Sequence, residues 1–443
     1  MSYNAIIAKI DNIKKHSNAD KLQVAEILGS QVIVGLNSKE GDIGILFPED
    51  GALSQIYADT NNLIRKIGEN GTNIGGLFEA KKRIKTIKLR GEKSEGYFAS
   101  LSSLEFTGYD ISTLKIGDKF DKLNNIPICN KYVTERTIKE FNKNNNYKKS
   151  KYEKSKYQYI TKLFPEHFDT DQFKHNINNI ETGALITITS KKHGTSGRAC
   201  CVQAPIKLNI FQKVINKIFF GNREHTKYEV FHGTRRVILN NKKKDDYYKD
   251  AFREKILNKL KLVINKNYVF YYEIVGYTGN GKPIVNPVDI TKTKNKEIIK
   301  RFSNPMIYKY GCLQGECDFY IHRITTINPD GIQEELPWSR VKKICKENGI
   351  KHVLELDSFM YNGNKEALIT HIENLTENKD IADPIDNSHI REGICIRVDN
   401  PNGTTKIYKN KLFMFRLLES IVKDTGVEDL EEIEDLKQFN GNN

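Results

Sequence analysis

Short runs of alternating apolar and polar residues fill the first 130 positions and predict β-strands. LQVAEILGSQVIVGL contains two such runs around Gly29 and Ser30, which is the pattern of a hairpin. DIGILFPEDGAL and RIKTIKLRGEKSEGYFASL repeat the rhythm, with glycine and proline closing each unit. Closely spaced short strands of this kind predict a small OB-type β-barrel over residues 1–130. A β-domain that serves only as a packing scaffold is the alternative.

Strands and helices alternate between residues 160 and 425 and predict a second, larger α+β domain. ALITITS and VFYYEIVGY are β-branched and aromatic runs, whereas DAFREKILNKLKLVI and WSRVKKICKENGI have helical spacing. Residues 131–159 are rich in Lys, Asn and Tyr and predict a basic interdomain linker. The alternative is that this segment binds a phosphate backbone and stacks bases on the rings of Tyr147, Tyr152 and Tyr157. Residues 426–443 form an acidic, polar tail.

Composition excludes several classes of protein. The 443 residues suffice for two or three domains, and 38% hydrophobic content with 21 Tyr and 21 Phe excludes wholesale disorder. No apolar run is long enough to span a membrane, and MSYNAIIAKI does not resemble a signal peptide. We therefore expect an intracellular soluble protein, cytoplasmic or nuclear, that has no membrane partner and acts as a monomer.

The seven cysteines are scattered and odd in number, which favours free thiols in a reducing compartment. Cys312 and Cys317 lack a second pair or a neighbouring histidine, so we interpret them as small buried residues and not as metal ligands.

The charge balance points to a polyanionic partner. Seventy Lys and Arg against 56 Asp and Glu give a net charge of +14, which fits nucleic acid but does not identify it. TGNGK at 278–282 is not a P-loop, because Pro283 stands where Ser or Thr is required. The motifs that follow therefore decide the function.

A strand runs directly into a glycine-containing turn at ALITITSKKHGTSGRA. Packing of the strand fixes the backbone beside Lys191, and Gly194 and Gly197 allow a bulky ligand to approach closely. A lysine of lowered pKa in such a turn is a competent nitrogen nucleophile. On its own this short pattern also fits an exposed turn lysine.

Four later segments supply complementary chemistry on predicted strands. Alternation along the strand KIYKNK places Lys409 and Lys411 on one face, where both can reach one phosphate. The set contains two carboxylates, an aromatic plate and paired cations, which are the parts needed to transfer a nucleotidyl group: Glu273, Phe319, Glu392, Lys409 and Lys411.

In order and spacing these motifs resemble the covalent nucleotidyltransferases, the superfamily of ATP-dependent RNA and DNA ligases and RNA capping enzymes. The resemblance spans residues 160 to 420, and KKHG together with the upstream PEHFDT is most similar to the RNA ligases. It implies an ATP-grasp-like, two-sheet α+β nucleotidyltransferase domain. It also implies that Lys191 attacks the α-phosphate of ATP to form lysyl-AMP, that AMP passes to an RNA 5′-phosphate, and that a 3′-OH then seals the strand.

The resemblance also implies roles for individual residues. Glu273 and Glu392 would hold Mg²⁺ or Mn²⁺, Phe319 would stack on adenine, and Lys409 and Lys411 would contact the α-phosphate and favour deprotonated Lys191. The implied ATP contacts also include Arg198, at the sugar or the RNA phosphate, and Arg235, for which Arg236 competes. His193 stands where many members of the superfamily have Asp, and so marks a subgroup.

Domain order separates the candidate enzymes. Only 32 residues follow Lys411, too few for the OB domain that DNA ligases and capping enzymes place there, so the predicted barrel precedes the transferase domain. This order resembles RNA ligases with an N-terminal OB module, acting on nicked duplexes or RNA ends. The alternatives are a DNA ligase, a capping guanylyltransferase, and a non-catalytic RNA-binding protein with a degenerate transferase fold.

Overall fold

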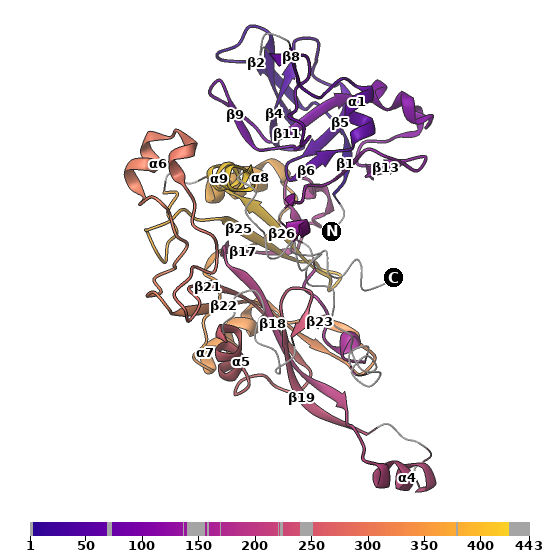
Figure 1. The fold of residues 1–443 in the computed structure, drawn as a ribbon, viewed down its shortest axis with the longest axis vertical. Coiled ribbons are helices and arrows are strands. Elements are labelled where there is room, and N and C mark those ends of the chain that lie inside the picture. The colour runs from indigo at the N-terminus through magenta and orange to yellow at the C-terminus, as the bar shows by residue number, and fades with distance from the viewer. Residues whose placement is uncertain are drawn as a thin grey trace. The chain divides into compact units, whose positions relative to one another are not determined.

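The chain folds into two compact units, which Figure 1 shows in a computed structural model. The structure describes residues 3–68, 73–135, 137–139, 156, 159–168, 170–219, 221, 225–239, 251–377 and 380–424. The first unit contains Met1–Glu135, Asp171–Asn179 and Lys411–Val427, and the second contains Arg136–Thr170, Ile180–Asn410 and Glu428–Asn443. The predicted linker tyrosines (147, 152 and 157) and the predicted acidic tail lie outside the described residues.

Two antiparallel sheets build the first unit. One has the strand order β11-β5-β1-β12 and the other β2-β3-β4. Their bounds are β1 Ala5–Lys9, β2 Asn12–Lys15, β3 Leu22–Ile27, β4 Ser30–Gly35, β5 Ile43–Pro48, β11 Gly96–Ser100 and β12 Lys119–Phe120. The predicted hairpin is β3–β4. It turns at Leu28 and Gly29, where both residues have positive φ, as a tight type I′ turn requires.

Alternation decides what each side of β1 and β5 contacts. Ala8 and Leu46 pack against residues of β3 and β4, whereas Ile7, Ile45 and Phe47 face a second apolar cluster. Both faces of these strands are therefore buried, which accounts for the continuous apolar run at the centre of DIGILFPEDGAL.

Short ladders and helices complete the first unit. They are β6 Gly51–Leu53, β7 Lys66–Ile67, β8 Asn73–Ile74, β9 Ile87–Leu89, β10 Glu92–Ser94, β13 Lys122–Leu123, β14 Ile126–Pro127, β15 Cys129–Lys131, β16 Asp171–Gln172, α1 Gln55–Thr60 and α9 Phe413–Asp424. Ion pairs join α9 to the N-terminal segment: Arg416 binds Glu95 and also Glu49, at 3.1 Å, and Asp424 binds Arg83 at 2.9 Å.

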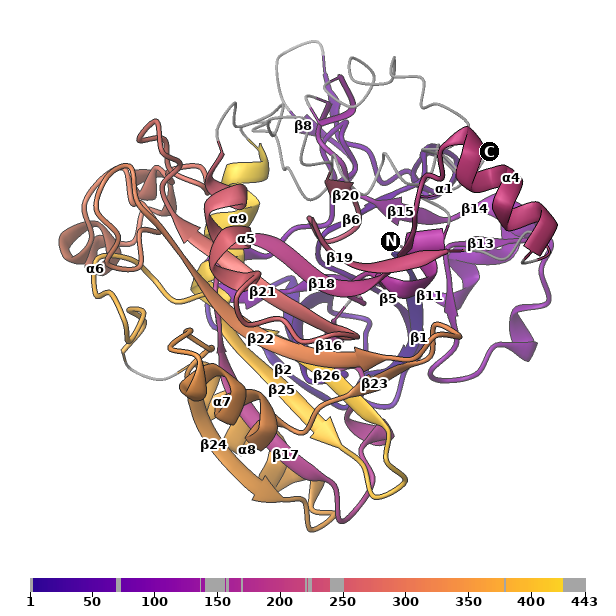
Figure 2. The same cartoon turned by 90° about the horizontal axis from the view of Figure 1, so that it is seen from below.

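The second unit contains two antiparallel sheets. The larger has the order β20-β19-β18-β21-β22-β23, and in the other β26, β25, β17 and β24 lie in that order (Figure 2). The larger sheet contains β18 Thr195–Pro205, β19 Thr226–Gly233, β20 Ile238–Leu239, β21 Tyr268–Gly276, β22 Cys317–Ile327 and β23 Gln333–Glu335. The smaller contains β17 Leu185–Lys191, β24 Glu355–Met360, β25 Gly393–Asp399 and β26 Thr405–Lys411.

Helices pack on these sheets where the sequence has helical spacing. The two predicted helices are present as α5 Phe252–Leu260, against β18 and β22, and α7 Trp338–Glu347, against β22. The remaining helices with described bounds are α4 Ile210–Phe219, α6 Lys296–Arg301 and α8 Lys365–Thr376. α8 packs on β25, so the two sheets are covered by different helices.

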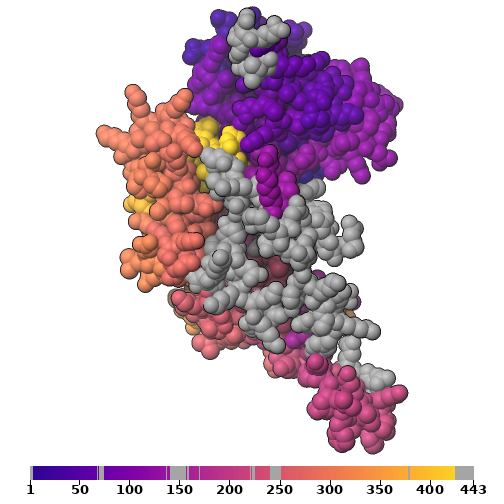
Figure 3. Space-filling model, in the orientation of Figure 1, coloured from indigo at the N-terminus to yellow at the C-terminus, as the bar shows by residue number. Residues whose placement is uncertain are grey.

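Helix α4 follows β18 and precedes β19, and it projects from the rest of the unit (Figure 3). Asn216 is its buried residue, and the Asn216 Oδ1 atom lies 2.9 Å from His225 Nε2. Its large apolar side chains are exposed, including Phe211 and Phe219 at 73% each. Apolar and polar side chains of this helix are thus both exposed, whereas a normal surface helix buries its apolar face.

The predicted α+β class is confirmed. Over the described ranges the ladders form separate sheets and no closed barrel, so the OB-type barrel remains a proposal. Within the same ranges no helix is both long and apolar enough to cross a membrane. All seven cysteines are free thiols, as predicted.

Candidate active site

The turn predicted to carry the nucleophile joins the two sheets of the second unit. Lys191 is the last residue of β17, and β18 begins at Thr195. Gly393 of β25 pairs with Lys191, which brings the preceding residue, Glu392, beside the lysine side chain. The Lys191 Nζ atom lies 2.9 Å from Glu392 Oε1 and 3.0 Å from Oε2. Two segments 201 residues apart in sequence therefore meet in one ion pair.

Electrostatics hold the Lys191 amine protonated in this state. Burial by itself lowers the pKa of Lys191, but the negative charge of Glu392, helped by Cys395 and Glu273, raises it above its ordinary value. The lysine is thus not a ready nucleophile at rest, and its proton has to leave before it can attack a phosphate.

Glu273 of β21 binds the turn itself. Its Oε1 atom accepts a hydrogen bond from the Gly194 backbone N–H at 3.0 Å, and its Oε2 atom accepts one from the Ser196 hydroxyl at 3.4 Å. The register explains this contact, because Ser196 and Glu273 are cross-strand partners. The carboxylate that sequence reasoning assigned to metal binding therefore also fixes the backbone next to Lys191.

Two glycines are required by close approach in this turn. A Cβ atom at Gly194 would lie 2.1 Å from the Ile274 carbonyl oxygen, and one at Gly197 would lie 2.2 Å from the Tyr272 ring. Any side chain at either position would separate β18 from β21. The glycines of the motif thus serve strand packing.

Cys395 of β25 lies where the predicted groups converge. Burial raises the pKa of its thiol to about 11; the charges of Lys191 and Lys409 oppose this rise, and those of Glu392 and Glu273 add to it. Since all four charges act on one thiol, Lys409 belongs to the same cluster as the two carboxylates and Lys191.

The chemistry of this cluster fits a divalent cation. Among the residues that the structure describes, no group of three His, Cys, Asp or Glu side chains could hold a metal ion. Glu273 and Glu392 would be the protein ligands of such a cation, with water and substrate phosphate supplying the remaining ligands, as is common for Mg²⁺.

Lys411 is the last residue of β26, and the boundary between the two compact units falls just before it. Its ammonium binds both Glu419 oxygens of α9, at 2.8 and 3.0 Å. Burial raises the pKa of the Glu419 carboxyl, but the charges of Lys411 and Lys423 together with the hydrogen bond from Lys411 lower it overall. In this state Lys411 is therefore an ion-pair partner of α9.

The register also separates Phe319 from the cluster. Tyr320 of β22 lies opposite Glu273, and Phe319 lies opposite Ile274, so Phe319 occupies the other face of the sheet. Its ring is 4% exposed and packs on Tyr272 with centroids 5.6 Å apart. The structure thus does not bring Phe319 together with Glu273, and adenine stacking would require this ring to leave the core.

Arg198 of β18 is buried and binds backbone carbonyls. Its guanidinium donates to the carbonyls of Phe164 at 2.6 Å, Arg236 at 2.8 Å and Thr234 at 2.9 Å. It also lies over the Phe164 ring. Arg198 therefore fixes two separate segments, one leading to His167 and one containing Arg235, in addition to any role towards the sugar.

We expect Arg198→Lys to destabilise the protein although it keeps the charge. A lysine ammonium cannot span three carbonyls in a plane, and the buried carbonyls left without a donor should cost about 3 kcal/mol in total. A lower midpoint of urea unfolding would show this loss. Arg340→Lys, at an exposed position of α7, is the matched control and should leave the midpoint unchanged. Equal midpoints for both variants would contradict the bracing role.

The segment PEHFDT supplies a ring cluster near the nucleophile. The His167 ring contacts those of Phe168, Tyr271 and His322, with centroids 4.9 to 5.5 Å apart. Burial lowers the pKa of His167 well below its ordinary value, and the charges of Arg235 and Lys191 contribute to the lowering. His167 is thus neutral and close to both. Arg236, the competing arginine, pairs instead with Glu166 at 3.5 Å.

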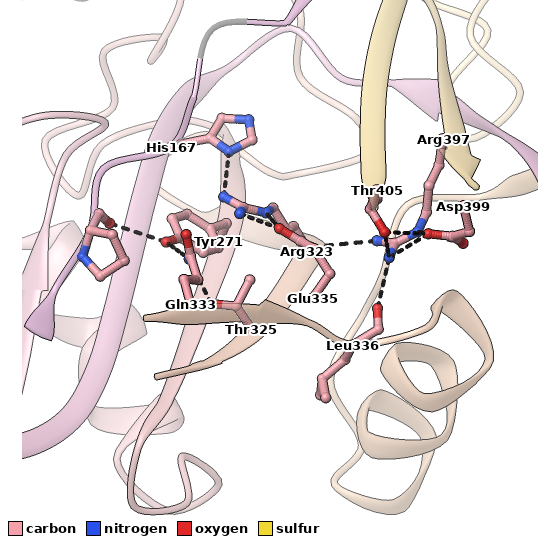
Figure 4. Close-up of polar contacts among 11 residues, drawn as sticks. His167, Tyr271, Arg323, Thr325, Gln333, Glu335, Leu336, Arg397, Asp399 and Thr405 are labelled. Atoms are coloured by element: carbon pink, nitrogen blue, oxygen red, sulfur yellow. Dashed lines mark hydrogen bonds and ion pairs between the residues drawn. The ribbon is translucent and has the colours of Figure 1, made fainter. Parts of the chain in front are cut away.

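A polar network continues from His167 across both sheets (Figure 4). Arg323 of β22 contacts His167 Nδ1 at 3.4 Å and donates from Nε to Glu335 of β23 at 2.7 Å. Glu335 faces Arg397 of β25 at 3.8 Å, and Arg397 binds Asp399 at 3.0 Å. Since the larger sheet carries Glu273 and the smaller carries Lys191, this network fixes the spacing of the two halves of the site.

The other side of the turn rests on buried aromatic rings. Tyr310 accepts a hydrogen bond from the His193 backbone N–H at 2.7 Å, and the His193 ring meets Tyr308 edge-on. Lys192 forms a buried ion pair with Asp383 at 2.9 Å. Adjacent lysines of KKHG therefore have different partners, which the sequence does not reveal.

The predicted residues thus divide into groups. Lys191, Glu273, Glu392 and Lys409 come together, and Arg235 lies near them by way of His167. His193 is at the turn, Arg198 braces it, Phe319 lies on the other face of the sheet, and Lys411 at the end of β26 binds Glu419. Sequence reasoning missed Cys395 and the ring of His167; the strand alternation of GICIRV was the available signal for Cys395.

The fold of this chain is similar to that of solved RNA ligase structures. A Naegleria gruberi RNA ligase mutant with AMP and Mn has a TM-score of 0.56 at 16% identity, covering 93% of this chain and 97% of that chain. A second mutant with ATP and Mn has a TM-score of 0.55 at 16% identity, covering 93% and 98%. The same ligase with PPi matches with a TM-score of 0.55 at 16% identity, covering 93% and 97%. At this identity the likeness shows the fold.

The family is shown by sequence. The family model described as RNA ligase matches residues 185–411, just over half of the chain, from the first residue of β17 to the last of β26. The chain therefore belongs to the RNA ligase family. A comparison with curated proteins gives no match.

Proposed function

We propose that this protein is an ATP-dependent RNA ligase that seals 3′-OH and 5′-phosphate ends. The observation that carries the proposal is the Lys191–Glu392 ion pair at the junction of the two sheets, with Glu273 and Lys409 close by. ATP, AMP, Mn and pyrophosphate, which appear in the names of the Naegleria structures, are the ligands expected here.

The reaction follows from the placement of the groups. Lys191 Nζ attacks the α-phosphorus of ATP, a P–N bond forms, and the bond to the β-phosphate breaks to release pyrophosphate. The amine proton goes to solvent, since Glu392 is expected to turn towards the cation. Mg²⁺ or Mn²⁺ held by Glu273 and Glu392 would neutralise phosphate charge. Lys409 is proposed to contact the α-phosphate. AMP then passes to the RNA 5′-phosphate, and attack by a 3′-OH seals the strand and releases AMP.

The contacts to the base and sugar of ATP complete the proposal. The charges of Arg235 and Lys191 both lower the pKa of His167, so His167 and Arg235 are proposed to border the nucleotide. Phe319, Arg198 and His193 keep their predicted roles as hypotheses, with Phe319 and Arg198 already engaged in packing. Lys411 would have to exchange Glu419 for phosphate.

The first unit is proposed to be an OB-type module that binds RNA. Its support is the pair of small sheets with a shared core and the basic charge of the chain. The free thiols favour a cytoplasmic or nuclear location, and a monomer is the proposed state.

The test is incubation with ATP labelled at the α-phosphate and a divalent cation, followed by RNA with 3′-OH and 5′-phosphate ends. An acid-labile, alkali-stable protein adduct should form, and then a sealed product. An adduct with GTP and none with ATP would favour a capping enzyme, and sealing of DNA ends alone would favour a DNA ligase. Failure to form any adduct with Mg²⁺ or Mn²⁺ would favour a non-catalytic RNA-binding protein.

A further inference from the structure

A cavity of about 620 Å³ lies between α7 and β22, apart from the Lys191–Glu392 ion pair. Lysines make up most of its wall. Three come from the later turns of α7, and the fourth precedes His352 in a segment that runs beside Ile321 of β22. The lining consists of Tyr320, Lys342, Lys343, Lys346, Ile350, Lys351 and His352.

The lining has the charge of an anion site. None of its seven residues is Asp or Glu. Three carboxylates outside the lining pair with its lysines: Glu355 with Lys342 at 2.6 Å, Glu347 with Lys343 at 3.8 Å, and Asp318 with Lys351 at 2.5 Å. The four ammonium groups outnumber these carboxylates, and exposed ion pairs of this kind exchange readily for another anion because each contributes little energy.

Tyr320 connects this cavity to the proposed active site. It forms part of the cavity wall and is the cross-strand partner of Glu273. Lys192, next to the nucleophile, lies 5.7 Å from the centroid of its ring, and Lys351 of the cavity lies 5.8 Å from it. The cavity therefore shares Tyr320 with the strand pair that carries Glu273.

We propose that this lysine cavity binds backbone phosphates of the RNA strand beside the break. The inference rests on the proposed function and adds a binding site to it. Lysines act as point charges without the planar fork of arginine, which suits contact with a backbone independent of sequence. Their spread over two elements matches successive phosphates better than the single triphosphate of ATP.

The test compares two pairs of substitutions in the full-length protein. Lys343→Gln with Lys346→Gln removes two exposed cavity charges, and Lys255→Gln with Lys259→Gln removes two exposed charges from α5 as the matched control. Binding of single-stranded RNA is measured without ATP over a range of salt concentrations. The cavity variant should bind several-fold more weakly at low salt, and its salt slope should fall by about 1.4, at about 0.7 per phosphate contact.

Measurements of adduct formation and of sealing distinguish binding of ATP phosphates from binding of RNA phosphates. Adduct formation with ATP should stay within twofold of wild type in both variants, while the cavity variant seals RNA with a several-fold higher KM. A salt slope equal to that of the control overturns the proposal. A selective loss of adduct formation would assign the cavity to ATP phosphates and also overturn it. If wild type forms no adduct, the proposed function is refuted. RNA binding is measured without ATP, so that measurement would still show whether the cavity binds RNA.

Discussion

Lys191→Met is expected to abolish the protein–AMP adduct and, with it, sealing of RNA ends that carry an unactivated 5′-phosphate. Methionine keeps most of the aliphatic volume beside Glu392 but has no amine that could form a P–N bond. The loss should reach the detection limit of an assay with labelled ATP, at least a thousandfold below wild type, because no other group supplies the covalent step.

The neighbouring lysine gives this experiment its control. Lys192 is buried and bound to Asp383, so it should carry no AMP when the wild-type adduct is mapped by peptide mass spectrometry. RNA that already carries a 5′-adenylate should still be sealed by Lys191→Met, since that step bypasses the lysine. An adduct on Lys192, or one that persists in Lys191→Met, would contradict the assignment of the nucleophile.

Glu392→Gln is expected to make the Lys191 amine more reactive towards a chemical reagent but to slow adduct formation with ATP. Glu392 supplies the largest charge that raises the pKa of Lys191, whereas burial, which lowers the pKa, remains in the variant. More of the amine is then deprotonated at a given pH. Its labelling by a small acylating reagent should increase at least tenfold at neutral pH, which corresponds to about one pKa unit.

Adduct formation by Glu392→Gln should nevertheless fall by about a hundredfold or more, because the amide is a poor ligand for the cation. In wild type the rate of adduct formation should rise with pH, since the protonated amine cannot attack. The residual rate of Glu392→Gln should rise over a lower pH range, because the pKa of its Lys191 is lower. Glu419→Gln, which removes the same charge beside Lys411, is the control and should leave labelling of Lys191 unchanged. Equal labelling of Lys191 in both variants would contradict the ion-pair argument.

The motifs and their order along the chain predicted which chemical groups form the site better than they predicted where those groups lie. Lys191, Glu273 and Glu392 could be predicted because each is a charged residue in or next to an apolar strand segment. Phe319 shows the limit: alternation gives two faces, and only the pairing of β22 with β21 decides that Tyr320 and not Phe319 lies on the side of Glu273.

Long-range partners were also beyond the sequence. The resemblance implied that Arg198 reaches the sugar or the RNA phosphate, yet its guanidinium is held by carbonyls 34 to 38 residues away. Lys409 and Lys411 were paired by strand alternation, but the compact units divide after Asn410, and Lys411 binds Glu419. Local pattern fixes which way a side chain points relative to its strand, and tertiary packing decides what it meets.

The outward-facing apolar side of α4 has a practical consequence. Five large side chains of this short helix, from Ile210 to Phe219, are between 50% and 83% exposed, so the hairpin tip will adhere to plastic, detergent micelles and chromatography resins. Purification yield and light scattering at high concentration should therefore improve when Phe211 and Ile218 are replaced by polar residues. The hydrogen bond between Asn216 and His225, on the opposite side, would keep the helix seated.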